Sequence, residues 1–139
     1  MKYIGLDLGS RTCGVSISDE LGILARALTT IRFKDDEYNY CAKEIIKICN
    51  DENVKKIVLG LPKHMNGDMG ERAKISLDFK DKLEKMADVE VILYDERLTT
   101  IAVDRIMIEG NLRRGERHKK KDEMAAVVIL QDFLNSKSF

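Results

Sequence analysis

Near its start the chain reads YIGLDLGSRTCGVSISD, residues 3–19. The apolar run at 3–8 has the length of one buried strand, and only the carboxylate of Asp7 interrupts it. An ionised carboxylate in a core strand is costly unless a cation or a hydrogen-bond donor meets it. The glycine-flanked turn at 9–14 carries Arg11 and lets the backbone approach whatever the acid binds. Asp7 is therefore either a ligand-binding acid or a cap of its own turn, and this stretch alone does not separate the two.

The bulk composition predicts one soluble globular domain spanning residues 1–139. Apolar residues make up 44% of the chain and charged residues 35%. Twenty-four basic and 24 acidic residues give a formal net charge of zero, which argues against global attraction to nucleic acid but allows a local basic strip. The apolar runs are too short for a signal peptide or a membrane span, so we expect a cytoplasmic protein without a membrane partner.

The three cysteines are not spaced as a metal clamp. Cys41 and Cys49 share one helical stripe, which predicts buried thiols. Cys13 lies in the turn after Asp7, where exposure to solvent is expected. A catalytic role for Cys13 has little support, because neither histidine lies near it in sequence.

Hydrophobic periodicity and turn residues predict an alternation of strands and helices, hence an α/β domain. After the strand at 3–8, the expected strands are 15–18, 23–31, 54–61 and 89–94. The strands at 3–8, 15–18 and 23–31 are expected to form an antiparallel meander. Four helices are expected. The first begins at Asp35 or Asp36 and ends near Asn50, and the second begins at Glu71 and Arg72. The third runs from Thr99 or Thr100 to Gly110, and the fourth begins at Asp122.

Polar residues follow two of the later strands. Lys63, His64 and Asn66 lie in a glycine-rich loop after the strand at 54–61, at the end of a parallel strand where α/β sheets bind ligands. An ordinary connection is the alternative. Glu96 and Arg97 follow the strand at 89–94 in a similar way, and their alternative role is a helix cap or plain solvated charge.

The segment at 111–121 is the strongest anomaly in composition. Nine of its residues hold six basic side chains, namely Arg113, Arg114, Arg117, Lys119, Lys120 and Lys121. A charge run of this kind is usually a solvated loop, and Gly115 favours a flexible one here. The segment leads directly into Asp122, whose simplest role is to favour the N-terminus of the last helix.

Three acids, Asp7, Glu96 and Asp122, occupy boundaries between elements. If the sheet brings the first and fifth strands near each other, these carboxylates converge, and their repulsion requires protonation or a cation. Oxygen ligands without a histidine or thiolate cluster favour Mg²⁺ or Mn²⁺. Two such ions roughly 4 Å apart stabilise both oxygens of phosphodiester hydrolysis. Spacing alone only suggests this site, because the chain has 24 acids.

Four motifs, which occur in order along the chain, support the prediction of this site. The runs Gly5-Leu6-Asp7-Leu8-Gly9-Ser10-Arg11, Gly60-Leu61-Pro62 with Asn66-Gly67 and Gly70, Asp95-Glu96-Arg97-Leu98-Thr99-Thr100, and Lys121-Asp122 with Ala125-Ala126 resemble the motifs of the YqgF/RuvX family. Together they span nearly the whole chain.

The resemblance implies an RNase H-like fold, with a mixed sheet of three antiparallel N-terminal strands and two parallel ones flanked by helices on both faces. It also implies a nuclease with catalytic, metal-binding carboxylates at Asp7, Glu96 and Asp122 and two Mg²⁺ or Mn²⁺ ions when substrate is bound. Asp7 is expected to bridge both ions, because it alone comes from the central strand. Bacterial members are associated with trimming the 5′ end of precursor 16S ribosomal RNA during ribosome biogenesis, and an older family label is Holliday junction resolvase.

The expected partner is nucleic acid, either precursor ribosomal RNA in a ribosomal particle or branched DNA. The expected contacts are Arg11, Lys63, His64, Asn66, Arg97, Arg113, Arg114, Arg117, Lys119 and Lys120. RNA and DNA are not distinguishable here, because backbone recognition uses the same basic residues for both. Trimming RNA requires only a monomer, whereas symmetric cleavage of a four-way junction requires two active sites and hence a homodimer.

Two further functions remain as alternatives. An actin-like ATPase or sugar kinase also opens with Asp-x-Gly-Ser, but this chain is too short to hold the two domains such proteins need. A non-catalytic RNA-binding factor of ribosome assembly or transcription is the other, and the presence of all three acids argues against it.

Overall fold

The computed structural model describes residues 1–35, 37–61, 70–95 and 114–137, and within the last range it describes the side chains of 124–136. The elements in chain order are β1 (Tyr3–Leu8), β2 (Thr12–Ser18), β3 (Ala25–Arg32), α1 (Tyr38–Glu52), β4 (Lys56–Leu61), α2 (Glu71–Met86), β5 (Glu90–Asp95) and α4 (Arg114–Lys137). The predicted helix at 99–110 lies outside the described residues.

The five described strands form one sheet in the order β3-β2-β1-β4-β5. The first three pair antiparallel, whereas β1 pairs parallel with β4 and β4 parallel with β5. This is the predicted mixed sheet, and β1 is its central strand. Leu6, Leu59 and Leu93 lie level across the three parallel strands, so the carboxyl ends of these strands meet at one edge.

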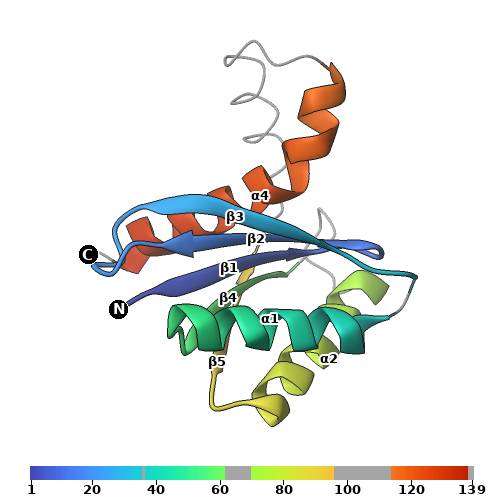
Figure 1. Cartoon of the computed structure of the whole chain (residues 1–139), viewed down its shortest axis with the longest axis horizontal. Coiled ribbons are helices and arrows are strands. Elements are labelled where there is room, and N and C mark those ends of the chain that lie inside the picture. The colour runs from blue at the N-terminus through green and yellow to red at the C-terminus, as the bar shows by residue number, and fades with distance from the viewer. Residues whose placement is uncertain (36, 62–69, 96–113, 138–139) are drawn as a thin grey trace.

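Helices cover both faces of the sheet, with α1 and α2 on one side and α4 on the other (Figure 1). Alternate residues of β1 enter the two cores: Ile4, Leu6 and Leu8 pack in the cluster that includes α1 and α2, whereas Tyr3 packs with Leu130 and other residues of α4. Because β1 is buried on both faces, it reads as a nearly continuous apolar run.

Small residues let α4 approach the sheet closely. A Cβ atom added at Gly5 would lie 2.5 Å from the Ser16 hydroxyl oxygen and 2.7 Å from the Leu130 Cβ. The buried Ser16 hydroxyl donates a hydrogen bond of 2.8 Å to the carbonyl oxygen of Ala126. Gly5 and Ser16 therefore fix α4 directly over β1 and β2.

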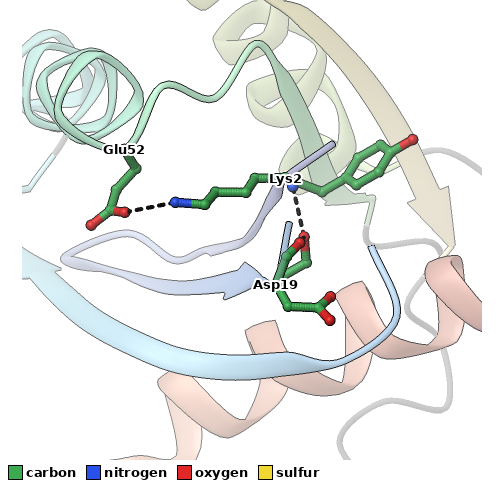
Figure 2. A network of polar contacts seen from close by, with 5 residues as sticks. Lys2, Asp19 and Glu52 are labelled. Carbon is green, nitrogen blue, oxygen red and sulfur yellow. Dashed lines mark hydrogen bonds and ion pairs between the residues drawn. The ribbon is translucent and has the colours of Figure 1, made fainter. Parts of the chain in front are cut away.

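Polar contacts hold the start of β1, at the end of the strand away from Leu8. The Lys2 ammonium lies 3.5 Å from a carboxylate oxygen of Glu52 and links the start of β1 to the end of α1 (Figure 2). The backbone N–H of Tyr3 donates a 2.8 Å hydrogen bond to the Ser18 hydroxyl, which in turn donates to the carbonyl of Asp19. These contacts tie the start of β1 to the end of α1 and to the end of β2.

Several predicted boundaries are wrong by a few residues: β2 begins at Thr12 and not at residue 15, and β4 begins at Lys56 and not at residue 54. The third strand begins at Ala25, because a carboxylate oxygen of Asp19 accepts the backbone N–H groups of Ile23 and Leu24 and holds both in a turn. Helix α1 begins at Tyr38, after Asp35 and Asp36, with Glu37 at its N-cap position.

The larger correction concerns α4. The basic segment was predicted as a loop with Asp122 opening the helix, but α4 begins at Arg114 and includes residues 114–121. Arginine, lysine and glutamate are good helix formers, and a single Gly115 near the end of the helix does not outweigh them. Asp122 therefore lies within a 24-residue helix and does not begin one.

Two of the three cysteine predictions are confirmed and one is wrong. Cys41 and Cys49 are buried as expected, and desolvation raises the pKa of Cys49 to about 11. The expectation of an exposed Cys13 is wrong: its side chain is fully buried, because β2 begins at Thr12 and places Cys13 opposite Leu8 in the core.

In the described ranges, every helix is too short or too polar to cross a lipid bilayer.

Candidate active site

Asp7 lies at the carboxyl end of β1, on the face that α4 covers. Side chains alternate along a strand, so Asp7 shares its face with Gly5 and Tyr3, which pack against α4. Asp7 is half-buried, and its cross-strand partner is Gly14, which has no side chain to fill the adjoining space. A carboxylate therefore stands at the open end of a buried strand.

The end of β5 lies at the same edge of the sheet, one strand removed. Strand β4 separates β1 from β5, and neighbouring strands are about 4.8 Å apart, so roughly 10 Å separates the two outer backbones. Asp95 ends β5 opposite Leu61. Glu96 follows it directly and lies outside the described residues. The prediction that the first and fifth strands lie near each other is confirmed, with β4 between them.

One stripe of α4 faces the sheet. Ala126, Leu130 and Leu134 recur every four residues and have exposed fractions of 0%, 0% and 1%. Asp122 occupies the preceding position of the same stripe, four residues before Ala126.

The register between α4 and β1 indicates which part of α4 lies toward Asp7. Ala126 and Leu130 lie against Gly5, and Phe133 contacts Tyr3 with ring centroids 5.6 Å apart, so α4 runs antiparallel to β1. Two strand residues rise about 6.6 Å and four helix residues about 6 Å. Stepping two residues from Gly5 to Asp7 therefore corresponds to about one helical turn toward the start of α4 from the residues that lie against Gly5. The side chain of Asp122 lies outside the described part.

The start of α4 extends past this edge. A 24-residue helix is about 36 Å long, whereas six-residue β1 is about 20 Å long. Figure 1 shows the first turns of α4 projecting beyond the sheet, away from the chain termini. Four of the predicted nucleic-acid contacts belong to this projecting part, namely Arg114, Arg117, Lys119 and Lys120.

Arg11 lies in the turn after β1 and is paired with an acid. Its guanidinium donates to both carboxylate oxygens of Asp35, at 2.7 Å through Nε and 3.1 Å through Nη2. Both side chains are well exposed. The hydrogen bond to Arg11 and its charge lower the pKa of Asp35, and the same contacts raise the pKa of Arg11. A phosphate that binds Arg11 must therefore compete with Asp35.

The remaining predicted residues are outside the described part of the chain. These are Lys63, His64, Asn66, Glu96, Arg97 and Arg113. Their predicted roles remain predictions.

One residue at this edge was not singled out from the sequence as a site residue. Arg72, in the first turn of α2, donates from Nη2 to the carbonyl oxygen of Leu8 at 2.9 Å. In the sequence Arg72 reads only as the opening of an amphipathic helix. Its position directly after the polar loop that follows β4 is the one signal that could have pointed to this edge.

Comparison with known proteins places these features in a family. The family model described as RuvX, Holliday junction resolvase, matches residues 1–136. A protein of Oceanobacillus iheyensis is 44% identical over 137 residues, covering 99% of this chain and 100% of that protein. A protein of Clostridium botulinum is 46% identical over 138 residues, covering 99% of each. Both are named "Putative pre-16S rRNA nuclease". The chain belongs to the RuvX family.

Solved structures confirm the fold of this RuvX chain. T. thermophilus RuvC in complex with Holliday junction substrate is similar with a TM-score of 0.61 and 14% identity, covering 99% of this chain and 96% of that one. The fowlpox virus Holliday junction resolvase gives a TM-score of 0.58 and 14% identity, covering 98% and 99%. At these identities the similarity establishes the RNase H-like fold.

The donor chemistry at the edge fits a hard divalent cation. Asp7 is a half-buried carboxylate, and the other two acids of the RuvX motifs also carry only oxygen donors, which Mg²⁺ and Mn²⁺ prefer. Within the described ranges no three potential metal-binding side chains cluster. The side chains of two of the three expected acids, Glu96 and Asp122, lie outside the described part of the chain.

Proposed function

We propose that this RuvX-family chain is a metal-dependent nuclease that acts in the cytoplasm on the 5′ end of precursor 16S ribosomal RNA. The observation that carries the proposal is the position of Asp7, half-buried at the carboxyl end of the central strand and on the face that α4 covers. The names of the two bacterial relatives favour RNA as the substrate.

In this proposal Asp7, Glu96 and Asp122 hold one or two Mg²⁺ or Mn²⁺ ions, whose positive charge relieves the repulsion between the acids. When bound, such ions make water more acidic and stabilise the charge on the leaving oxygen of a phosphodiester. Asp7 lies on the central strand, so the chain itself fixes this carboxylate before the reaction and little reorganisation of it is needed.

The basic residues serve the substrate. The projecting start of α4, with Arg113 just before it, neutralises phosphates that flank the cleaved bond. We assign Arg11, Arg97 and the loop residues Lys63, His64 and Asn66 further contacts with the nucleic acid. A neutral chain gains a local positive strip in this way, although its net charge is zero.

The decisive experiment compares Asp7→Asn with the wild-type protein on a 5′-extended precursor 16S RNA in Mg²⁺ and in Mn²⁺. We expect a folded protein, verified by circular dichroism, whose cleavage is at least a thousand-fold slower, because the variant loses a charged ligand at the site. Asp81→Asn, at an exposed position of α2, is the matched control and should cleave normally. Equal cleavage by Asp7→Asn and the wild type would remove Asp7 from the chemistry.

The basic strip is tested separately by changing Arg113 and Arg114 to Ala. The double variant should bind RNA more weakly and with a flatter salt dependence, because about two phosphate contacts are lost. Unchanged affinity and salt slope would identify the segment as solvated charge.

A resolvase that acts on four-way DNA is the second candidate, and the description of the matching family model favours it. The same cleavage assay with a four-way junction in place of RNA distinguishes the two. Binding of RNA without metal and without cleavage of either substrate would instead support a non-catalytic RNA-binding factor.

A further inference from the structure

Arg72 bridges α2 and the end of the central strand. Its Nη2 donates a 2.9 Å hydrogen bond to the carbonyl oxygen of Leu8, the last residue of β1 and the neighbour of Asp7 in sequence. The two partners are 64 residues apart, so this contact exists only in the folded chain. It fixes the guanidinium at the edge of the sheet where Asp7 stands.

The contact uses a small part of what the guanidinium offers. Arginine carries five N–H donors in a planar fork, and the hydrogen bond to the Leu8 carbonyl oxygen uses only one nitrogen, Nη2. Arg72 remains an exposed residue, so water or a ligand reaches its side chain. Such a fork matches the paired oxygens of a phosphate.

Its charge also distinguishes Arg72 from Arg11. Arg11 forms a two-point ion pair with Asp35, which offsets its charge. Arg72 takes part in none of the four ion pairs formed among the described residues, and its identified acceptor is a neutral carbonyl. At the edge beside Asp7, Arg72 is thus a described cation that is anchored to β1 but takes part in none of these ion pairs.

We infer that Arg72 is a phosphate-binding residue of the active site: one N–H anchors it to Leu8, and the others bind a backbone phosphate of the nucleic acid next to Asp7. The inference rests on the proposed function for the identity of the substrate. It adds a substrate contact from α2, an element to which the sequence motifs assign none.

The test measures binding of a labelled 5′-extended precursor 16S RNA, and of a four-way DNA junction, in EDTA at several salt concentrations. Arg72→Gln should weaken binding about three- to ten-fold and lower the salt slope by about 0.7 to 0.9, the value of one lost phosphate contact. Arg72→Lys should recover the slope, because it keeps the charge, while recovering only part of the affinity, because it lacks the fork. In Mg²⁺, Arg72→Gln should raise KM with little change in kcat.

Lys74→Gln is the matched control, because it removes one exposed positive charge from the same helix two residues away. Three results would overturn the inference: an unchanged salt slope in Arg72→Gln, an equal loss in Lys74→Gln, or a fall in Tm with normal binding, which would identify a purely structural contact. These results are independent of the proposed function, which fails instead if the wild type cleaves no RNA. If the wild type binds neither nucleic acid, both proposals fail.

Discussion

At the scale of single residues, the acids around the first turn have different environments. Asp7 is half-buried on a strand, whereas Asp35 is exposed and paired with Arg11 across 24 residues of sequence. Asp7 can be recognised from sequence, because an acid inside an apolar run is costly. The Arg11–Asp35 and Arg72–Leu8 contacts cannot, because each joins residues that only the fold brings together.

The pairing of Arg11 yields a prediction for Asp35→Asn. Loss of the carboxylate frees the Arg11 guanidinium for phosphate, so RNA affinity in EDTA should rise about 1.5- to 5-fold, the modest range expected for an exposed ion pair. Fluorescence anisotropy with a labelled precursor RNA measures the change.

Two further variants isolate the cause. Asp51→Asn removes an exposed acid from α1 and should change affinity less, so it measures the general effect of one charge. In an Arg11→Ala background, Asp35→Asn should lose its effect. A gain that persists in that background would show that Asp35 does not act through Arg11.

At the scale of elements, the sheet could be predicted from the sequence but the length of α4 could not. Apolar runs and turn residues give all five strands, because burial on both faces leaves a strong signal in each. The start of α4 was missed, because its first turns carry no apolar stripe and helix propensity alone had to decide them. Its sheet-facing stripe, which includes Ala126, Leu130 and Leu134, becomes apparent only once the packing of Ala126 on Gly5 is known.

That packing predicts the effect of Gly5→Ala. The new methyl group would lie 2.5 Å from the Ser16 oxygen, 2.7 Å from the Leu130 Cβ and 3.0 Å from the Ala126 carbonyl oxygen, so α4 must shift away from β1. We expect a loss of about 1–3 kcal/mol in the free energy of unfolding, measured by urea denaturation. Cleavage should fall more than stability explains, because position 122 moves with the helix.

Gly9→Ala is the control for this change. Its closest contact would be the Thr12 carbonyl oxygen at 3.1 Å, within the same turn, and no contact to α4 is involved. It should cost less stability and leave α4 in place. Equal losses in the two variants would mean that the fit between β1 and α4 is not what limits stability at Gly5.

The interface between α1 and α2 gives a prediction of the opposite sign. The Tyr38 hydroxyl is buried and has no hydrogen-bond partner among the described residues, beside a cavity of about 330 Å³ lined by Ile75, Asp78, Phe79 and Lys82. A buried polar group without a partner costs about 1–3 kcal/mol. Tyr38→Phe should therefore leave the free energy of unfolding unchanged or raise it by about 1 kcal/mol, because the ring still packs against Phe33 and Phe79.

Tyr40→Phe serves as the comparison, because Tyr40 is 48% exposed two residues along the same helix and its change should be neutral. Urea denaturation of both variants measures the difference. A clear destabilisation by Tyr38→Phe alone would show that the hydroxyl has a strong partner, such as an ordered water in the cavity.

At the scale of the whole molecule, the proposed catalytic acids Asp7, Glu96 and Asp122 amount to one set in each chain. The four motifs predict the type and order of these acids, and their convergence stays a prediction, because Glu96 and the side chain of Asp122 lie outside the described part of the chain. The packing of α4 antiparallel to β1 directs the part of α4 before Ala126 toward the end of β1 that carries Asp7.

One active site per chain leads to a prediction about oligomeric state and substrate. Trimming an RNA end needs one cut, whereas resolving a four-way junction needs two symmetric cuts and hence a two-fold dimer. Since we propose RNA as the substrate, we expect sedimentation equilibrium at assay concentration to give the monomer mass of 15.9 kDa, with RNA cleaved at a rate proportional to protein concentration. A four-way junction should be bound through its phosphates but not resolved into two nicked duplexes. Paired, symmetric junction cleavage by a species of twice the monomer mass, with RNA left intact, would contradict the proposal and favour the resolvase.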